Sequence, residues 1–473
     1  MGNSVSTGSD KKNDQSAQIS QDLETLGSSS VSLHSPEKQA AVYRLRQNLV
    51  QSRSVPEKLA ACAKIEQERY ALWPTPPSPK SSAPTTFDND HRAMVADRVR
   101  GLIYGCALGD AVGLATEFLS RRQVQDFYGN NTLLCPQPAR VYPDTHRIMW
   151  QAGDWTDDTD QMIVVLKSLF HCVGTFPQEN SISNEDLSML ERDFATRLLD
   201  WKEHGFADLG DEGGVGMGQQ TKRVLTSLGF VEHPTHVAQQ VWQQGKCRAA
   251  ANGALMRTAV TGLPFYWDLS KVNQITASIC QTTHADPKCV ASCVSMATLV
   301  ALLLQRKDEE IGLETENDAQ TIEALIQESL DVASRYLPDE ESAQAEFKDY
   351  VQVQSQTLEA LELDDPSSIG YTYKCLGAGI WGLRATTGTT TDPSCMTFDE
   401  MIQTLVSQGG DADTNAMVAG GLWGCRRGFR QLPSEWIAQL PHAAWLEAHV
   451  QKVLFLLDLL PPVRENTNES KVS

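Results

Sequence analysis

The sequence has little of what a β-sheet protein or a nucleic-acid binder needs. Strand-like alternation of apolar and polar residues is scarce, and its best candidates are the short segments 140–142 and 147–150. Strands that alternate with helices, as a parallel sheet requires, are not indicated. Basic residues are outnumbered, since 40 Lys and Arg face 60 Asp and Glu and leave a formal net charge of −20. That charge argues against a protein that binds nucleic acid through its phosphates.

Segments for export or for crossing a membrane are also scarce. Residues 1–30 contain no apolar block of the kind found in secretory signal peptides. The longest apolar run, 290–304, includes Ser292, Ser295 and Thr298 and is short for a bilayer, so we expect a buried core helix. The 11 cysteines are scattered, without paired zinc-finger spacing, which favours a reducing, cytoplasmic setting and leaves the nucleus open.

Residues 1–90 differ in composition from the rest and are expected to form an extension outside the main domain. The start is rich in Ser, Asp and Gln and predicts disorder, and two short amphipathic helices and a proline-rich linker, 74–84, follow. Gly2 stands in a sequence that fits the N-myristoylation pattern, with a chance match as the alternative. Because only Lys11 and Lys12 add basic charge, membrane association through this lipid would be weak and reversible.

The main domain is predicted to be helical, because its apolar residues recur every three or four positions. Helical patterns cover 159–172, 185–203, 218–228, 235–244, 268–281, 289–306, 318–336, 343–361, 372–384, 398–407, 415–430 and 442–460. The sequence therefore predicts an all-α fold, with a single compact multi-helix domain over 91–462 and a disordered tail over 463–473. We expect the protein to be a monomer.

Two acidic stretches suggest a metal site. Asp411 and Asp413 follow a glycine pair, and residues i and i+2 of an extended backbone point to the same side, so both carboxylates could face one ligand. A similar acidic stretch, 154–160, lies far away in the sequence, as expected when two loops converge on one site. Carboxylates held this close repel each other unless a cation lies between them. Oxygen ligands, with the Thr414 hydroxyl among them, suit Mg²⁺, Mn²⁺ or Ca²⁺, whereas a solvated turn is the alternative for either stretch alone.

Three further stretches have residue types that gather at ligand sites. The glycine-rich loop 210–218 precedes a predicted helix, where backbone N–H groups can hold a phosphate; a flexible loop is the plainer alternative. The small residues of 250–257 let the backbone approach a ligand closely, although Asn252-Gly253 is above all a turn signal. His284 lies in a polar loop between two predicted helices, where site residues collect.

Three known motifs fit the aspartates only in part. An EF-hand fails because its required Gly and Glu positions hold Ala416 and Leu422. A terpenoid-synthase-type Asp-Asp-x-x-Asp motif that starts at Asp157 ends at Gln161 instead of an aspartate. A glycosyltransferase Asp-x-Asp site fits 411–413 locally, but such enzymes use an α/β nucleotide-binding domain, which the sequence does not indicate.

Taken in order over about 90–430, the motifs of this chain resemble those of the ADP-ribosylglycohydrolase family, which includes the dinitrogenase-reductase-activating glycohydrolases. The resemblance is carried by 105–113 with Glu117, 156–159, 213–218, 252–257, 283–287 and 409–414. It implies an all-helical domain with two Mg²⁺ ions, or Mn²⁺ in their place. The implied metal ligands are Thr156, Asp157, Asp158, Asp411, Asp413 and Thr414.

The resemblance also implies an activity. Glu117 and Asp157 would be catalytic, and the bond cleaved would be the N- or O-glycosidic bond between ADP-ribose and a modified amino-acid side chain or small conjugate. The residues around the ADP-ribose would be Gly214, Gly216, Gly218, Asn252, Gly253, Ala254 and His284. The partners would be ADP-ribosylated proteins or small ADP-ribose conjugates, with the linkage left open. The alternatives are a non-catalytic ADP-ribose-binding or scaffold protein of the same fold and a helical, Mg²⁺-dependent terpenoid-synthase-like enzyme.

Overall fold

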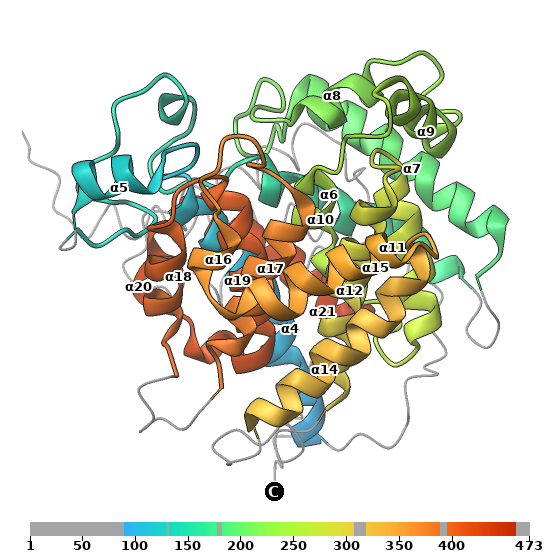
Figure 1. Cartoon of the computed structure of the whole chain (residues 1–473). Helices are drawn as coiled ribbons and strands as arrows, with labels where there is room; N and C mark the ends of the chain where they lie inside the picture. The colour runs from blue at the N-terminus through green and yellow to red at the C-terminus, as the bar shows by residue number, and fades with distance from the viewer. Residues whose placement is uncertain (1–88, 130–131, 177–181, 307–317, 388–394, 460–473) are drawn as a thin grey trace, which may run out of the picture.

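The computed structural model describes residues 89–129, 132–176, 182–306, 318–387 and 395–459. The expectations for the N-terminal extension, for myristoylation at Gly2 and for the tail concern residues outside this part. Within these ranges the chain forms helices and no β-strand, with two isolated bridges, Ser120 to Gly409 and Ala251 to Tyr371. The predicted all-α fold is therefore confirmed (Figure 1).

Most of the helices lie close to the ranges that the apolar periodicity predicts. The α-helices are α4 (Asn89–Gly113), α5 (Arg121–Tyr128), α6 (Asp157–Cys172), α7 (Asn184–His204), α8 (Gln219–Leu225), α9 (Pro234–Gln244), α10 (Leu255–Thr258), α11 (Leu269–Gln281), α12 (Pro287–Gln305), α14 (Asp318–Ala333), α15 (Glu341–Lys348), α16 (Leu358–Leu361), α17 (Thr372–Arg384), α18 (Phe398–Val406), α19 (Ala412–Arg427), α20 (Ser434–Gln439) and α21 (Ala443–Leu456).

Several segments differ from the sequence-based expectation, and among them α5, α10 and α20 lie outside every predicted helical range. The candidate strand 147–150 forms the 3-10 helix η1 (Arg147–Met149), and 140–142 forms no strand. The predicted helix 343–361 is broken between α15 and α16 by the π-helical turn η6 (Asp349–Val353) and the 3-10 turn η7 (Gln354–Gln356). Apolar spacing cannot reveal such a break, because it does not show which carbonyl each N–H group reaches.

The helix pair α4 and α19 lies at the centre of the molecule, where blue and orange-red ribbons run side by side (Figure 1). The face of α4 toward α19 carries glycine at every fourth position: Gly101, Gly105, Gly109 and Gly113. A Cβ atom on Gly105 would overlap the carbonyl oxygen of Gly420, so the two backbones touch without side chains between them. Because the helices run antiparallel, this contact brings the end of α4 to the start of α19.

Helix α12 forms another part of the core. It packs against α11, α14 and α17. It is also the one helix of the described ranges that is long and apolar enough to cross a membrane, and 89% of its apolar window is buried inside the protein. The expectation that the 290–304 run is a buried core helix is therefore confirmed.

Candidate active site

The first acidic stretch forms the start of α6. The helix begins at Asp157, and Oγ1 of the N-cap Thr156 accepts a hydrogen bond from the backbone N–H of Asp158 (3.3 Å). Asp110 on α4 fixes this turn from the side, since its carboxylate accepts hydrogen bonds from the backbone N–H groups of Thr156 (3.0 Å) and Thr159 (3.0 Å). Burial raises the pKa of Asp110 to about 6 despite these hydrogen bonds. Asp110 belongs to a motif noted in the sequence, but its role in shaping the site is visible only in the structure.

The second acidic stretch forms the start of α19. Asp411 is the N-cap and Asp413 lies in the first turn, so the extended backbone predicted here is wrong, and a helical turn brings the carboxylates together. Carboxylates are favoured at this end of a helix because its free N–H groups carry partial positive charge. Gly409 and Gly410 precede the helix with φ values of 70° and 71°, which glycine adopts without strain. A Cβ atom on Gly409 would also overlap the carbonyl oxygen of Leu119.

The two helix starts meet at one place. Oγ1 of Thr156 lies 3.4 Å from Oδ2 of Asp413, and the Thr414 hydroxyl donates to Oδ1 of Asp411 (3.3 Å). The structure thus brings both predicted halves of the metal site together. It does so through the backbone contact of α4 with α19 and through Asp110, which holds α6 against α4.

Glu117 reaches the same place from the loop after α4. One ligand oxygen from each of Glu117, Asp411 and Asp413 lies within 4.8 Å of the other two. Oε2 of Glu117 also pairs with Nε2 of His146. Arg147 holds this loop by donating hydrogen bonds to two of its backbone carbonyl oxygens, including that of Glu117. Neither His146 nor Arg147 is predicted as a site residue from the sequence, because no local pattern shows that they face Glu117.

The site concentrates buried negative charge. Burial raises the pKa values of Asp157, Asp158 and Asp413 well above the ordinary range, and neighbouring carboxylates raise them further. Burial also raises the pKa of Glu117, although its contact with His146 acts in the opposite direction. Oδ2 of Asp158 is buried and has no hydrogen-bond partner within the described part of the chain. Clustered carboxylate oxygens, one of them unpaired, are a donor set that fits a hard divalent cation.

The glycine-rich loop lies against one side of these carboxylates. A Cβ atom on Gly216, where φ is 98°, would overlap Oδ1 of Asp157, so only glycine fits there. The loop precedes a helix, as predicted, and Gly218 is the N-cap of α8 with open space beside its Cα atom. Gly214 differs from these two, because a Cβ atom there would lie 2.9 Å from the Trp201 ring and not beside a carboxylate.

The turn η3 (Asn252–Ala254) lies against another side. Nδ2 of Asn252 donates to Oδ2 of Asp411 (2.9 Å). A Cβ atom on Gly253 would lie 3.3 Å from Nε2 of His284, so the turn passes over the edge of this ring. Ala254 is fully buried in the core, which leaves its side chain no access to a ligand. The structure therefore places Asn252 on the carboxylate of Asp411 and Gly253 against the ring of His284.

An aromatic row borders the site as well. The rings of Phe118 and His146 lie 5.1 Å apart, and those of His146 and Trp150 lie 4.9 Å apart. A Cβ atom on Gly216 would lie 3.0 Å from the Trp150 ring, which connects the row to the glycine-rich loop. Phe118 is 55% exposed, so the row offers apolar surface next to Glu117. The sequence does not predict this surface, since its members come from two separate loops.

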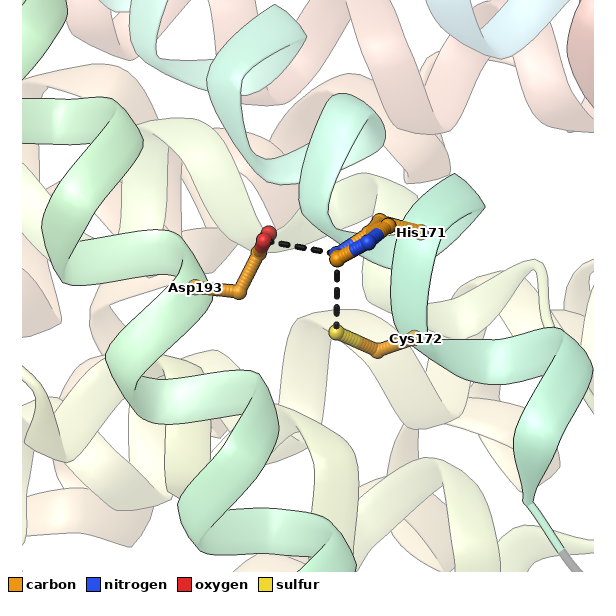
Figure 2. A group of neighbouring side chains, drawn as sticks. All are labelled: His171, Cys172 and Asp193. Atoms are coloured by element: carbon orange, nitrogen blue, oxygen red, sulfur yellow. Dashed lines mark hydrogen bonds and ion pairs between the residues drawn. The ribbon is translucent and has the colours of Figure 1, made fainter.

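A second group of possible ligands lies at the far end of α6 and on α7. Figure 2 shows His171, Cys172 and Asp193 in contact. Arg197 donates to both carboxylate oxygens of Asp193 (2.7 and 3.2 Å), and Nδ1 of His171 lies 2.7 Å from one of them. Burial raises the pKa of Cys172 to about 12, so the thiol stays protonated. A carboxylate that Arg197 already pairs and a protonated thiol fit a metal ion poorly, and the His171–Asp193 hydrogen bond instead connects α6 with α7.

The structure is thus an all-helical fold in which two acidic helix starts face each other beside a glycine-rich loop, and the carboxylates of Glu117, Asp411 and Asp413 form a group that could hold a metal ion. The family model for ADP-ribosylglycohydrolase matches residues 91–465, and the chain belongs to this family. The resemblance noted in the sequence is therefore confirmed.

The relatives share about a quarter of their residues with this chain. An uncharacterised protein of Archaeoglobus fulgidus is 25% identical over 358 residues, which cover 76% of this chain and 96% of the relative. The ADP-ribosylarginine hydrolase Tri1 of Pseudomonas putida is 25% identical over 374 residues, covering 78% and 80%. The ADP-ribosyl-[dinitrogen reductase] glycohydrolase of Rhodospirillum rubrum is 23% identical over 346 residues, covering 73% and 91%.

Proposed function

We propose that this protein is a Mg²⁺-dependent hydrolase that cleaves the N- or O-glycosidic bond between ADP-ribose and a modified side chain or small conjugate. The observation that carries the proposal is the meeting of the α6 and α19 N-termini, with Thr156 next to Asp413. Family membership supports hydrolysis of ADP-ribose linkages. The names of two relatives, which refer to ADP-ribosylarginine and to ADP-ribosylated dinitrogen reductase, support ADP-ribosylated proteins as substrates.

The residues that would hold the metal are those of the two helix starts. The set comprises Thr156, Asp157, Asp158, Asp411, Asp413 and Thr414. Mg²⁺, or Mn²⁺ in its place, would neutralise these carboxylates, hold ribose hydroxyls and lower the pKa of a bound water. The unpaired Oδ2 of Asp158 is the observation that fits this assignment best.

The remaining residues have roles in the bond cleavage itself. Breaking the bond from C1″ of the ribose to nitrogen or oxygen builds positive charge at that carbon. We assign Glu117 as the base that takes a proton from the attacking water, whose oxygen bonds to C1″, and that returns this proton to the leaving side-chain atom. Asn252 holds Asp411 in place through Nδ2. The missing side chain of Gly216 lets the glycine-rich loop pack directly against Oδ1 of Asp157, and we assign the backbone N–H groups of this loop to the diphosphate of the substrate.

A panel of defined substrates tests the proposal. Arginine-linked and serine-linked ADP-ribosyl peptides, O-acetyl-ADP-ribose and poly(ADP-ribose) are incubated with the full chain in Mg²⁺ or EDTA, and free ADP-ribose is measured by liquid chromatography. Release from at least one substrate in Mg²⁺, and none in EDTA, supports the hydrolase. Binding of ADP-ribose without release from any substrate would instead favour the non-catalytic ADP-ribose-binding protein.

A further inference from the structure

A buried arginine joins the two sides of the site. Arg257 on α10 is fully buried, and its guanidinium packs over the Phe194 ring with 5.0 Å to the ring centre. Its Nη1 donates to Oε1 of Gln161 (3.0 Å) and to the carbonyl oxygen of Gly253 (3.0 Å). Its Nη2 donates to Oγ1 of Thr283 (2.6 Å). One side chain therefore contacts helix α6, which begins with the acidic stretch, the turn η3, which carries Asn252, and the loop that carries His284.

The first arm of this network ends on a carboxylate of the site. A guanidinium only donates hydrogen bonds, so Gln161 accepts with Oε1 and turns its amide nitrogen the other way. That nitrogen donates to Oδ2 of Asp157 (2.7 Å). The other oxygen, Oδ1, is the one that lies beside Gly216. Arg257 thus determines, through Gln161, which oxygen of Asp157 accepts the amide hydrogen bond. That oxygen is Oδ2, and Oδ1 is the one that faces the glycine-rich loop.

The second arm ends on His284. Oγ1 of Thr283 accepts from Arg257 and lies 2.8 Å from Nδ1 of His284, with no other acceptor for the hydroxyl proton among the described residues. If Nδ1 carried the ring proton, both the hydroxyl proton and the Nε2 lone pair would be buried without partners. If the hydroxyl donates to Nδ1 instead, only Nε2–H lacks a partner. Burial lowers the pKa of His284 to about 3, with a smaller contribution from Arg257, so the ring carries a single proton.

We propose that Arg257 is a positioning residue that acts through Thr283 to hold His284 in the form protonated on Nε2, so that this N–H donates to an oxygen of bound ADP-ribose. The proposal rests on the proposed function for the identity of the ligand. It is supported by Nε2 itself, which is buried and has no partner within the described chain. The turn that carries Asn252, the side chain bonded to Asp411, passes close to this nitrogen, since a Cβ atom on Gly253 would lie 3.3 Å from Nε2.

Substitutions at Thr283 test whether its hydroxyl sets the tautomer of His284 while the shape of the side chain is kept. Thr283→Val keeps the shape but removes the hydroxyl, and Thr283→Ser restores it. The matched control is Thr226→Val, because Thr226 lies exposed at the end of α8 and its hydroxyl bonds only its own helix. Nitrogen-15 NMR of histidine-labelled protein reports which ring nitrogen carries the proton, and calorimetry with ADP-ribose reports affinity.

We expect Nε2 protonation of His284 in the wild type, the Thr283→Ser variant and the control, and a mixture of ring forms in Thr283→Val. ADP-ribose affinity should fall about tenfold in Thr283→Val, which is the loss of one hydrogen bond to a ligand. Arg257→Lys keeps the positive charge but loses the planar guanidinium that donates in several directions, so we expect the same mixture of His284 tautomers. We also expect a lower kcat, because Asp157 loses its fixed orientation.

Different results would contradict the proposed hydrolase function and the positioning role of Arg257. A wild-type protein that neither binds nor releases ADP-ribose contradicts the proposed function, while the NMR spectrum still reports the ring form. Protonation of wild-type His284 on Nδ1 overturns the positioning role. So does a Thr283→Val variant that binds ADP-ribose as tightly as the wild type while the wild type is active.

Discussion

The hydroxyl of Thr156 at the start of α6 lies 3.4 Å from Oδ2 of Asp413 in the first turn of α19, across a sequence separation of 257 residues. Each of these helix starts alone would be an ordinary acidic N-terminus, stabilised by its own N–H groups. Together they place more buried carboxylates in one spot than those groups can compensate. That excess is the physical reason to assign a divalent cation here.

Removal of one carboxylate from either helix should abolish turnover. Asp157→Asn and Asp411→Asn keep the size of the side chain but remove a charge that would bind Mg²⁺, so we expect loss of ADP-ribose release and weaker Mg²⁺ binding by calorimetry. Far-UV circular dichroism should stay unchanged. The charge-matched control is Asp126→Asn, since Asp126 lies exposed on α5 and, among the described residues, pairs with Arg122 alone. Full activity in either site variant contradicts the two-helix site.

Glu117→Gln should separate catalysis from metal binding. The amide cannot take a proton from water, so we expect turnover to fall by about a hundredfold or more, with Mg²⁺ affinity retained. Because a Glu117 oxygen lies within 4.8 Å of ligand oxygens from Asp411 and Asp413, calorimetry with Mg²⁺ decides its role. Loss of Mg²⁺ binding in this variant would make Glu117 a metal ligand instead of the base.

Stability without metal should depend on pH in a defined direction. Burial raises the pKa of Asp110 from its ordinary 3.8 to about 6, and those of Asp157, Asp158 and Asp413 are raised as well. A carboxyl group whose pKa is higher in the folded than in the unfolded state stabilises the fold at pH values below its unfolded-state pKa. This stabilisation is lost as the pH rises through its folded-state pKa. In EDTA we therefore expect the free energy of unfolding to fall on the order of 1–3 kcal/mol between about pH 4 and pH 7.

Mg²⁺ should reverse that loss, because it binds the ionised carboxylates of the folded chain only. Thermal unfolding at several pH values, with Mg²⁺ and with EDTA, measures both effects. A melting temperature in EDTA that rises steadily over this pH interval would contradict the burial of uncompensated carboxylates.

The contact of α4 with α19 should tolerate no added methyl group. A Cβ atom on Gly105 would overlap a backbone carbonyl of α19, so Gly105→Ala must push the helices apart. We expect a destabilisation of roughly 1–3 kcal/mol, as for an overpacked core, even though alanine favours helix. Gly174→Ala is the control, since nothing lies within 4 Å of its Cβ position. Urea unfolding that shows equal stability for both variants would contradict the close approach.

The sequence predicts most of the helices well, because apolar periodicity is a local signal. Apolar spacing locates α7, α9 and α17 to within a few residues, and the clustered aspartates of 154–160 and 411–413 mark the two helix starts that the structure brings together. It locates the starts of α6 and α19 less well, placing each inside its helix. Those starts are set by Thr156 and by Asp411, which belong to the acidic stretches and carry no apolar periodicity.

The supporting residues could not be predicted, because their roles depend on contacts between distant segments. Asp110 differs from its small apolar neighbours, yet only the fold shows that it accepts hydrogen bonds from the start of α6. Arg257 and Gln161 are 96 residues apart, and His146 and Glu117 are 29 apart. A single sequence contains no periodicity that relates such pairs.

Anomalous diffraction from crystals soaked in Mn²⁺ would locate the metal ion directly. We expect anomalous density between the α6 and α19 N-termini, within ligand distance of Asp158 and Asp413, and its loss in Asp411→Asn crystals. Density only at the His171, Cys172 and Asp193 group, or none at the two helix starts in crystals of active enzyme, would contradict this expectation.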